Sequence, residues 1–166
     1  MAELTPTERL QPSLLDRLTD EEPAQSQEGR NRRVLSIQRL RESVLRDVGW
    51  LLNTTNMADK DLKERYPYVA RSVVNFGLPD LAGLTASAID TGELELLVRQ
   101  AIIEFEPRIL SNSLVVRAHG ADEMNHNALV FEIAGELWAQ PVPLELFLKT
   151  EIDLETGDFA ISEVAR

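Results

Sequence analysis

The sequence predicts an α+β protein in which amphipathic helices pack on one face of a small antiparallel β-meander. Apolar residues recur at helical spacing as far as Phe105. After Arg108 the spacing changes to strict alternation, which is typical of strands with one buried side. Helical segments that precede a run of strands indicate helices gathered on one side of an antiparallel sheet.

Residues 1–33 are expected to form a flexible arm and linker, and residues 34–166 a single α+β domain. A short amphipathic helix is predicted within the arm, with Ser13 as its N-cap. Its apolar side consists of Leu10, Leu14, Leu15 and Leu18. Because so short a helix is not stable alone in water, these leucines must pack on their own domain or on a partner. The pattern leaves both arrangements open.

Residues 36–53 are predicted to form the first long helix, with an apolar stripe on one side and arginines on the other. The stripe consists of Ile37, Leu40, Val44, Val48, Leu51 and Leu52. Residues 66–80 combine aromatic side chains with two prolines and a glycine. Such a segment is either a lid on the core or a surface for a partner, since aromatic residues concentrate at interfaces.

The most strongly patterned stretch runs from Glu93 to Phe105 and is predicted to be a helix. Asp90 and Glu93 form a helix-start signal, in which the first side chain accepts from free backbone N–H groups. Pro107 lacks an N–H group and disfavours helical geometry at Glu106. The helix is therefore expected to end near Phe105 or Glu106.

Two carboxylates and a guanidinium follow at this helix end, on Glu104, Glu106 and Arg108. Paired carboxylates are the proton-handling groups of glycosidases. Here, however, residues two apart point to different sides of a helix, and a nearby arginine favours the ionised state, which is wrong for a general acid. The pattern favours a salt bridge inside the domain or a charged interface element, and no catalytic residue is assigned.

Three strands are predicted after this corner, each with a core-facing side. Their core-facing residues are Leu114, Val116 and Ala118, then Leu129, Phe131 and Ile133, then Leu144, Leu146 and Leu148. A turn at residues 155–158 leads into a short fourth strand at residues 159–161.

Bulk properties limit the possible functions. The absence of cysteine excludes disulfides and thiolate metal sites, and no apolar run is long enough to span a bilayer. A cytoplasmic protein without direct membrane insertion is expected. A net charge of −11 argues against a nucleic-acid partner. The groups His119, Asp122, Glu123 and His126 match no established ligand spacing, so neither a metal nor another cofactor is predicted.

Charge is nevertheless distributed unevenly along the chain. Arginines crowd residues 30–46, whereas acidic residues dominate after Gly120. This distribution fits a solvated surface with internal pairing, and it also fits a polarised subunit that docks between unlike neighbours.

Several segments taken in order resemble one family. They are residues 12–18 (PSLLDRL), 51–54 (LLNT), 72–80 (SVVNFGLPD) and the triplet Glu106-Pro107-Arg108. In this order they are similar to the TssE family of baseplate subunits of type VI secretion systems, which is related to the lysozyme-like wedge proteins of contractile phage baseplates. The resemblance covers about residues 10–160.

The resemblance implies a structural role, in a baseplate wedge on which a contractile sheath assembles. The implied partners are the wedge subunits TssF, TssG and TssK and the first sheath ring. The signature residues carried over are Glu106, Pro107 and Arg108, with an interface or fold-locking role. The lysozyme-like label leaves one alternative, a peptidoglycan glycosidase using Glu104 or Glu106.

Overall fold

The computed structural model describes residues 13–19, 37–57, 64–82, 90–120, 128–139 and 143–164. The helices are α1 (Leu14–Leu18), α2 (Ile37–Leu52), α4 (Pro67–Ala70), the 3-10 helix η3 (Val73–Asn75) and α5 (Thr91–Phe105). The strands are β1 (Val115–Gly120), β2 (Ala128–Leu137), β3 (Leu144–Asp153) and β4 (Phe159–Glu163).

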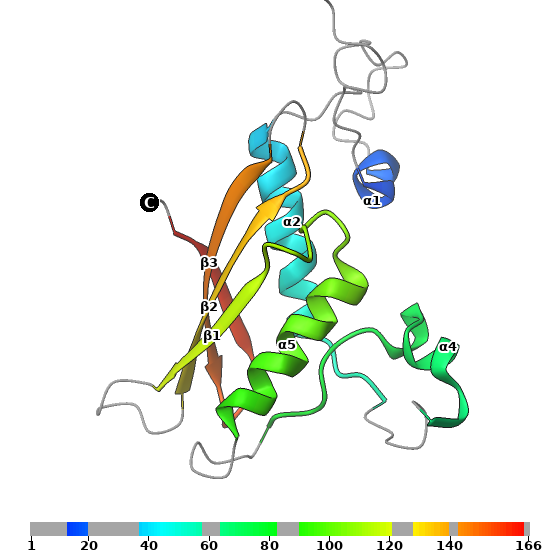
Figure 1. The fold of residues 1–166 in the computed structure, drawn as a ribbon, viewed down its shortest axis with the longest axis vertical. Helices are drawn as coiled ribbons and strands as arrows, with labels where there is room; N and C mark the ends of the chain where they lie inside the picture. Colours follow the sequence, from blue (N-terminus) through cyan, green and yellow to red (C-terminus); the bar gives the residue numbers. More distant parts are fainter. Residues whose placement is uncertain are drawn as a thin grey trace, which may run out of the picture.

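The strands form one sheet in the order β1-β2-β3-β4, and every neighbouring pair is antiparallel. Helices α2 and α5 lie together on one face of this sheet (Figure 1). Helix α5 contacts β1, and α2 contacts β4 at the opposite margin. The α+β class and the meander predicted from the sequence are therefore confirmed.

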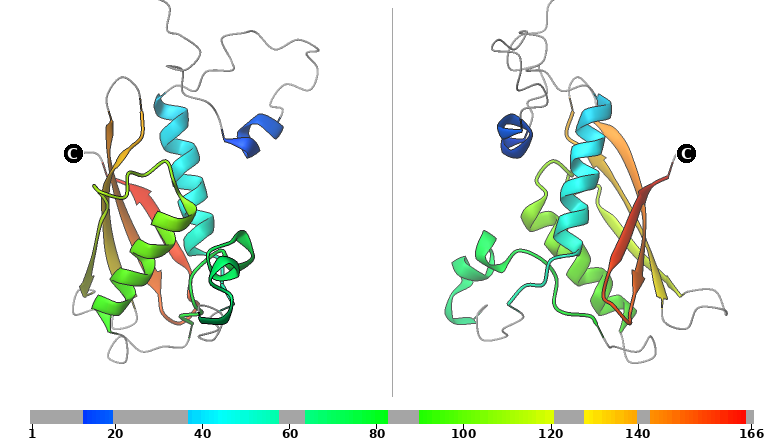
Figure 2. Two further views of the ribbon diagram at one scale, coloured as in Figure 1. Left: turned by 45° about the vertical axis from the view of Figure 1, so that its right-hand side comes forward. Right: turned by 180° about the vertical axis from the view of Figure 1, so that it is seen from behind.

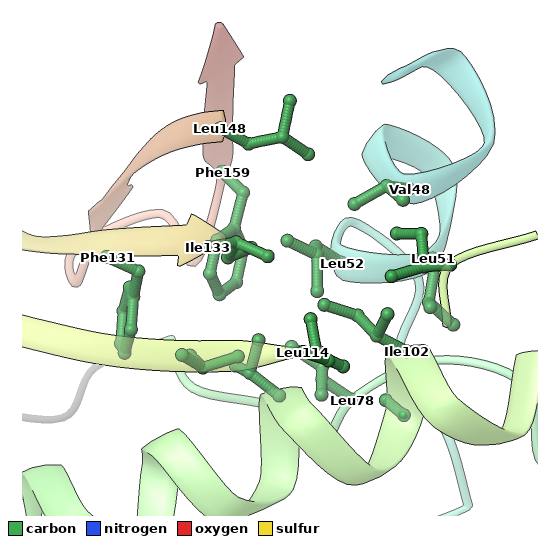
Figure 3. Close-up of a cluster of buried hydrophobic side chains, with 14 of the residues drawn as sticks. Val48, Leu51, Leu52, Leu78, Ile102, Leu114, Phe131, Ile133, Leu148 and Phe159 are labelled. Carbon is green, nitrogen blue, oxygen red and sulfur yellow. The ribbon is translucent and has the colours of Figure 1, made fainter. Parts of the chain in front are cut away.

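The core lies between the sheet and the two helices, as the alternation predicted (Figure 3). Its helical side includes Val48, Leu51 and Ile102, which are almost fully buried. Its sheet side includes Phe131 and Leu148, whose neighbours along each strand are more exposed. An alternating strand therefore gives the sheet one apolar face, and that face carries both helices.

Helix α5 begins and ends where the local chemistry requires. The Asp90 side chain accepts hydrogen bonds from the backbone N–H groups of Gly92 (2.9 Å) and Glu93 (3.2 Å), so Asp90 is the N-cap. The helix ends at Phe105 with Glu106 as the C-cap, directly before Pro107. Both predicted boundaries are confirmed.

The segment containing α4 and η3 stands away from the sheet, on the outer side of the helices (Figure 2). Tyr68 is 92% exposed and Val73 is 81% exposed, so a lid on the core is the wrong description of this part. The end of the segment does pack inward, where Leu78 is buried and Phe76 makes an edge contact with Phe105 at 5.2 Å between ring centroids.

A close backbone approach attaches this segment to the end of α2. The N–H group of Leu78 donates to the carbonyl oxygen of Thr54 (2.8 Å), and that of Asn56 donates to the Leu78 carbonyl (2.8 Å). Gly77 has a φ of 114°, and a Cβ at this position would lie 2.0 Å from the Thr54 oxygen. Only glycine fits this approach, which explains why the sequence has it there.

Candidate functional site at the helix–sheet corner

The corner between α5 and the sheet is fixed by backbone hydrogen bonds on both sides of Pro107. The N–H group of Glu106 donates to the Ile102 carbonyl (2.8 Å), which completes the last turn of α5. The carbonyl of Arg108 accepts from the N–H group of Trp138 (2.7 Å), directly after β2. Residues 106–108 therefore connect the end of a helix to the end of a strand with little freedom.

Glu106 and Arg108 form a two-pronged ion pair across Pro107. The Arg108 Nε donates to Glu106 Oε1 (2.6 Å), and its Nη2 donates to Glu106 Oε2. The backbone N–H group of Arg108 also donates to Glu106 Oε1 (3.2 Å). Glu106 is only 3% exposed, so its charge depends on these donors.

Helix α2 supplies the remaining partners of Arg108. Ser43 Oγ accepts from Arg108 Nη1 (3.0 Å), and Asp47 Oδ2 accepts from Arg108 Nη2 (2.6 Å). Ser43 and Asp47 lie four residues apart, on the same side of the helix. Burial lowers the pKa of Arg108, but the hydrogen bonds and charges of Glu106 and Asp47 outweigh it, and the pKa lies above its ordinary value.

The charged contacts continue from the corner to the arm helix. Arg46 Nε donates to Asp47 Oδ1 (2.8 Å), and Arg46 Nη1 donates to Asp16 Oδ1 (2.6 Å). The Asp16 carboxylate and the Ser13 hydroxyl also cap α1 reciprocally. A chain of alternating charges, here called the corner relay, therefore consists of Glu106, Arg108, Asp47, Arg46 and Asp16.

The electrostatics of the outer half of the corner relay favour the charged forms. Burial raises the pKa of Asp16, but hydrogen bonds from Ser13 and Arg46 together with the charge of Arg46 lower it further, and the net pKa lies below its ordinary value. The hydrogen bond to Asp47 raises the pKa of Arg46. Arg46 Nη2 is buried and has no acceptor among the residues that the structure describes.

Glu104 points to a different place from Glu106. Its Oε1 accepts from Gln100 Nε2 (3.0 Å) and lies 3.4 Å from Arg71 Nε, on the side of α5 that faces α4. It lines an open pocket of about 410 Å³ between α5 and the segment around α4 and η3. The two carboxylates therefore bind different arginines and do not face one another across a shared cleft, as a glycosidase pair must.

The predicted arm helix is present, and its leucines are exposed. Leu14 is 71% exposed and Leu18 is 74% exposed, while Leu15 is less so. Leu10 lies outside the described residues. In the described part of the chain, α1 therefore contacts the domain through Asp16 and Arg46, and its apolar side is available.

Sequence reasoning located the corner but not its partners on α2. Ser43 and Asp47 flank the apolar stripe beside Val44 and Val48, at a spacing of four. Two polar residues at this spacing, beside a buried stripe, indicate that α2 makes a polar contact at the edge of the core. This pattern did not identify Arg108 as the partner, which lies 61 residues beyond Asp47.

Of the other candidate residues, the structure describes His119 alone. His119 Nε2 lies 3.3 Å from Glu132 Oε2 on the exposed face of the sheet, whereas Asp122, Glu123 and His126 lie outside the described residues. Within the described ranges, no group of three His, Asp or Glu side chains is arranged to hold a metal ion. None of the helices described there is long and apolar enough to cross a membrane.

Comparison with protein families gives one match. Residues 38–142, which are more than half of the chain, match the family model described as baseplate wedge protein gp25. The matched region begins in α2 and ends just before β3, and it contains every residue of the corner relay except Asp16. Searches of curated proteins and of solved structures return no match.

Proposed function

The chain belongs to the baseplate wedge protein gp25 family, and from this premise we propose that it is the TssE-like wedge subunit of a type VI secretion system, acting in the cytoplasm. A baseplate component works by binding its neighbours in a fixed geometry. The proposed partners are the wedge subunits TssF, TssG and TssK and the base of the contractile sheath. The ordered set of segments shared with the TssE family supports the secretion-system assignment over a phage particle.

The observation that carries the proposal is the corner itself. All side-chain acceptors of Arg108 belong to the same domain, on α2 and at the end of α5. A partly buried arginine that joins two helices to the end of a strand makes the domain rigid, and a rigid module holds its neighbours in fixed positions. We assign Glu106, Pro107 and Arg108 a fold-locking role, and Glu104 a supporting contact to Arg71.

Docking surfaces follow from what the fold leaves exposed. The leucines of α1 form one apolar surface, close to the outer end of the corner relay. The segment of α4 and η3 forms another, with Tyr66, Tyr68 and Val73 exposed. We propose that these two surfaces bind wedge subunits, since apolar and aromatic side chains supply most of the energy at protein interfaces. We further propose that the sheath docks by adding a strand to an edge of the sheet.

A co-purification experiment tests this function. The chain, with its arm intact, is expressed together with TssF, TssG and TssK and isolated through a tag on TssF. We expect a stable complex that a triple Leu14→Ser, Leu15→Ser, Leu18→Ser variant forms less well, with the same melting temperature as the unaltered chain. A chain that never enters the complex would contradict the wedge assignment.

The glycosidase alternative requires its own measurement. Purified chain is incubated with peptidoglycan, alongside Glu104→Gln and Glu106→Gln variants. We expect no release of sugar fragments, because the two carboxylates are bound to separate arginines. Cleavage that disappears in either variant, while the wedge complex still forms, would establish the enzyme and remove the purely structural role.

A further inference from the structure

The two outer strands of the sheet differ in what covers them. On β1, the outward N–H group of Ala118 donates to Glu95 Oε1 (2.7 Å), and directly before β1 the carbonyl of Leu114 accepts from Arg99 Nε (3.2 Å). Both side chains come from α5. They occupy the line along which an incoming strand would lie and leave Val116 between them, so side chains of α5 compete with a strand at this edge.

The pairing of β4 with β3 fixes which groups of β4 point outward. The N–H group of Val164 donates to the Phe147 carbonyl (2.9 Å), and that of Asp153 donates to the Asp158 carbonyl (3.0 Å). Because the pattern alternates along antiparallel strands, residues 160 and 162 also bond to β3. The N–H and C=O groups of Phe159, Ile161 and Glu163 therefore point away from the sheet.

Asn53 closes this edge at one end. Its Oδ1 accepts from the N–H group of Phe159 (2.8 Å), and its Nδ2 donates to the Phe159 carbonyl (3.0 Å). One side-chain amide therefore makes the two hydrogen bonds that a neighbouring strand would make. The same Nδ2 also donates to the Gly49 carbonyl (2.9 Å), which holds the amide at the end of α2.

The outward groups of Ile161 and Glu163 remain. They make no hydrogen bond to any residue in the described part of the chain. Beside them, α2 presents Gly49, which carries no side chain, and a Cβ there would lie 3.9 Å from Ile161 Cδ1. The Glu163 carboxylate is turned to Arg41 of α2 and leaves its backbone uncovered.

The strands and the turn that form this edge are rich in acidic side chains, of which Glu163 is paired with Arg41 of α2. Residues 143–164 contain one basic side chain, Lys149. Their acidic side chains are Glu145, Glu151, Asp153, Glu155, Asp158 and Glu163. An extended segment carrying lysine or arginine is the complementary partner, and it must lack proline where it donates to the ladder.

We propose that β4, and not β1, receives the added strand, that this strand is a basic extended segment of the sheath subunit, and that Asn53 fixes its register by closing the edge at Phe159. The inference rests on the sheath docking proposed above and adds to it the edge, the pairing residues and the residue that sets the register. Main-chain hydrogen bonds at Ile161 and Glu163 would provide the attachment, and the Asn53 amide would stop the segment from sliding towards the turn at residues 154–156.

Amide hydrogen exchange tests the assignment directly. The full chain is compared free and bound to the purified sheath subunit of the same secretion system. We expect new protection at the amides of Ile161 and Glu163 and no change at Val116. Protection at Val116 would overturn the choice of edge. Binding without protection at either edge would overturn strand addition, and no binding at all would contradict the sheath partner in the proposed function.

Two pairs of variants make the test sharper. Ile161→Pro removes an outward N–H group that bonds nothing in the free chain, and proline is tolerated at such edge positions. We expect binding to weaken about tenfold, whereas Ile161→Val, which keeps the N–H group, stays within about twofold. Equal binding by both variants would contradict pairing at Ile161.

Asn53→Ala exposes the Phe159 groups and tests the register. Exchange is measured at a temperature where the variant remains folded. In the complex, the newly protected amides should then include that of Phe159. Asn53→Gln is the control. It keeps the side-chain amide, but the longer side chain cannot reach both the N–H and the carbonyl group of Phe159 at the distances that Asn53 keeps. If the protected set stays limited to Ile161 and Glu163 in Asn53→Ala, Asn53 does not set the register.

Discussion

At the scale of single residues, the corner depends on Arg108. Its guanidinium makes four side-chain hydrogen bonds, and the acceptors lie on Ser43, Asp47 and Glu106. The planar fork of arginine suits this arrangement, since a lysine ammonium has no rigid set of donors in one plane. Removal of Arg108 would leave the buried Glu106 carboxylate without its counter-ion, and the lost stability would come mainly from that unpaired charge.

Replacement of Arg108 by alanine should therefore lower the free energy of unfolding by about 3 kcal/mol. Thermal or denaturant unfolding of the purified chain measures this. The double variant Arg108→Ala, Glu106→Gln should recover part of the loss because it no longer buries an unpaired charge.

Arg71→Ala is the matched control for Arg108→Ala. Arg71 also pairs with a glutamate, but its side chain is 74% exposed, so its loss should change stability by less than about 1 kcal/mol. Similar losses of unfolding free energy in both variants would show that the ion pairs of the corner stabilise the fold no more than an exposed pair does.

The position of this corner was predictable from sequence, whereas its partners were not. Proline ends a helix through local chemistry, so Pro107 located the corner without knowledge of the fold. The contact between Arg108 and Asp47 joins residues 61 apart, and no periodic pattern encodes which distant polar residue pairs with which. The contact of Asn53 is even harder to predict from the sequence, because its partner Phe159 is 106 residues away.

At the scale of elements, the periodic segments followed their predictions except at Ile37, which is 52% exposed, whereas the aperiodic segment had been left open between two alternatives. Helices α2 and α5 and the alternating strands lie where apolar spacing indicated, since burial of one face selects both the element and its orientation. The segment of α4 and η3 has no period. Its aromatic content gave no way to tell a lid from a surface, because exposure there depends on what other elements have already covered.

Helix α1 is the element held most weakly in the described structure. It buries no residue, and its contact with the domain is the ion pair between Asp16 and Arg46. The Asp16 carboxylate also accepts from the N–H and hydroxyl groups of the N-cap Ser13, so the same carboxylate supports the cap of α1 and attaches the helix. Loss of the charge on Asp16 should therefore remove both features together.

This coupling predicts a pH dependence on the acid side. The folded-state pKa of Asp16 is lowered, so its contribution is complete above the unfolded-state value and is lost as pH falls through the folded value. Amide exchange of residues 14–18 should thus show protection near neutral pH that disappears below pH 3.8, the ordinary value for this carboxyl. In Asp16→Asn the protection should be low throughout. Protection in that variant equal to the unaltered chain would show that another contact holds α1.

At the scale of the whole molecule, we propose that the arm and the α+β domain have different tasks in the assembly. The domain has a complete core between the sheet and its two helices, and α1 adds no buried side chain to it. The apolar surface of α1 is thus expected to be used only when a neighbouring subunit covers it.

Deletion of residues 1–33 should leave the domain folded, with a change in unfolding free energy below about 1 kcal/mol, since what is lost in the described contacts is one partly exposed ion pair. Entry into the wedge complex should fall at the same time. Calorimetry and co-purification measure the two effects separately. Unfolding of the shortened chain would show that the arm is part of the core, and undiminished assembly would show that its leucines have no partner there.

The ion pair between Arg41 and Glu163 joins the first turns of α2 to the last residues of β4. The start of α2 and the end of β4 therefore lie next to each other, although α5 and strands β1 to β3 come between them in the sequence. This is the arrangement in which circular permutation succeeds. A short linker from the end of β4 to the start of α2, with new termini opened between β1 and β2, would preserve the core and place the termini at the far end of the meander.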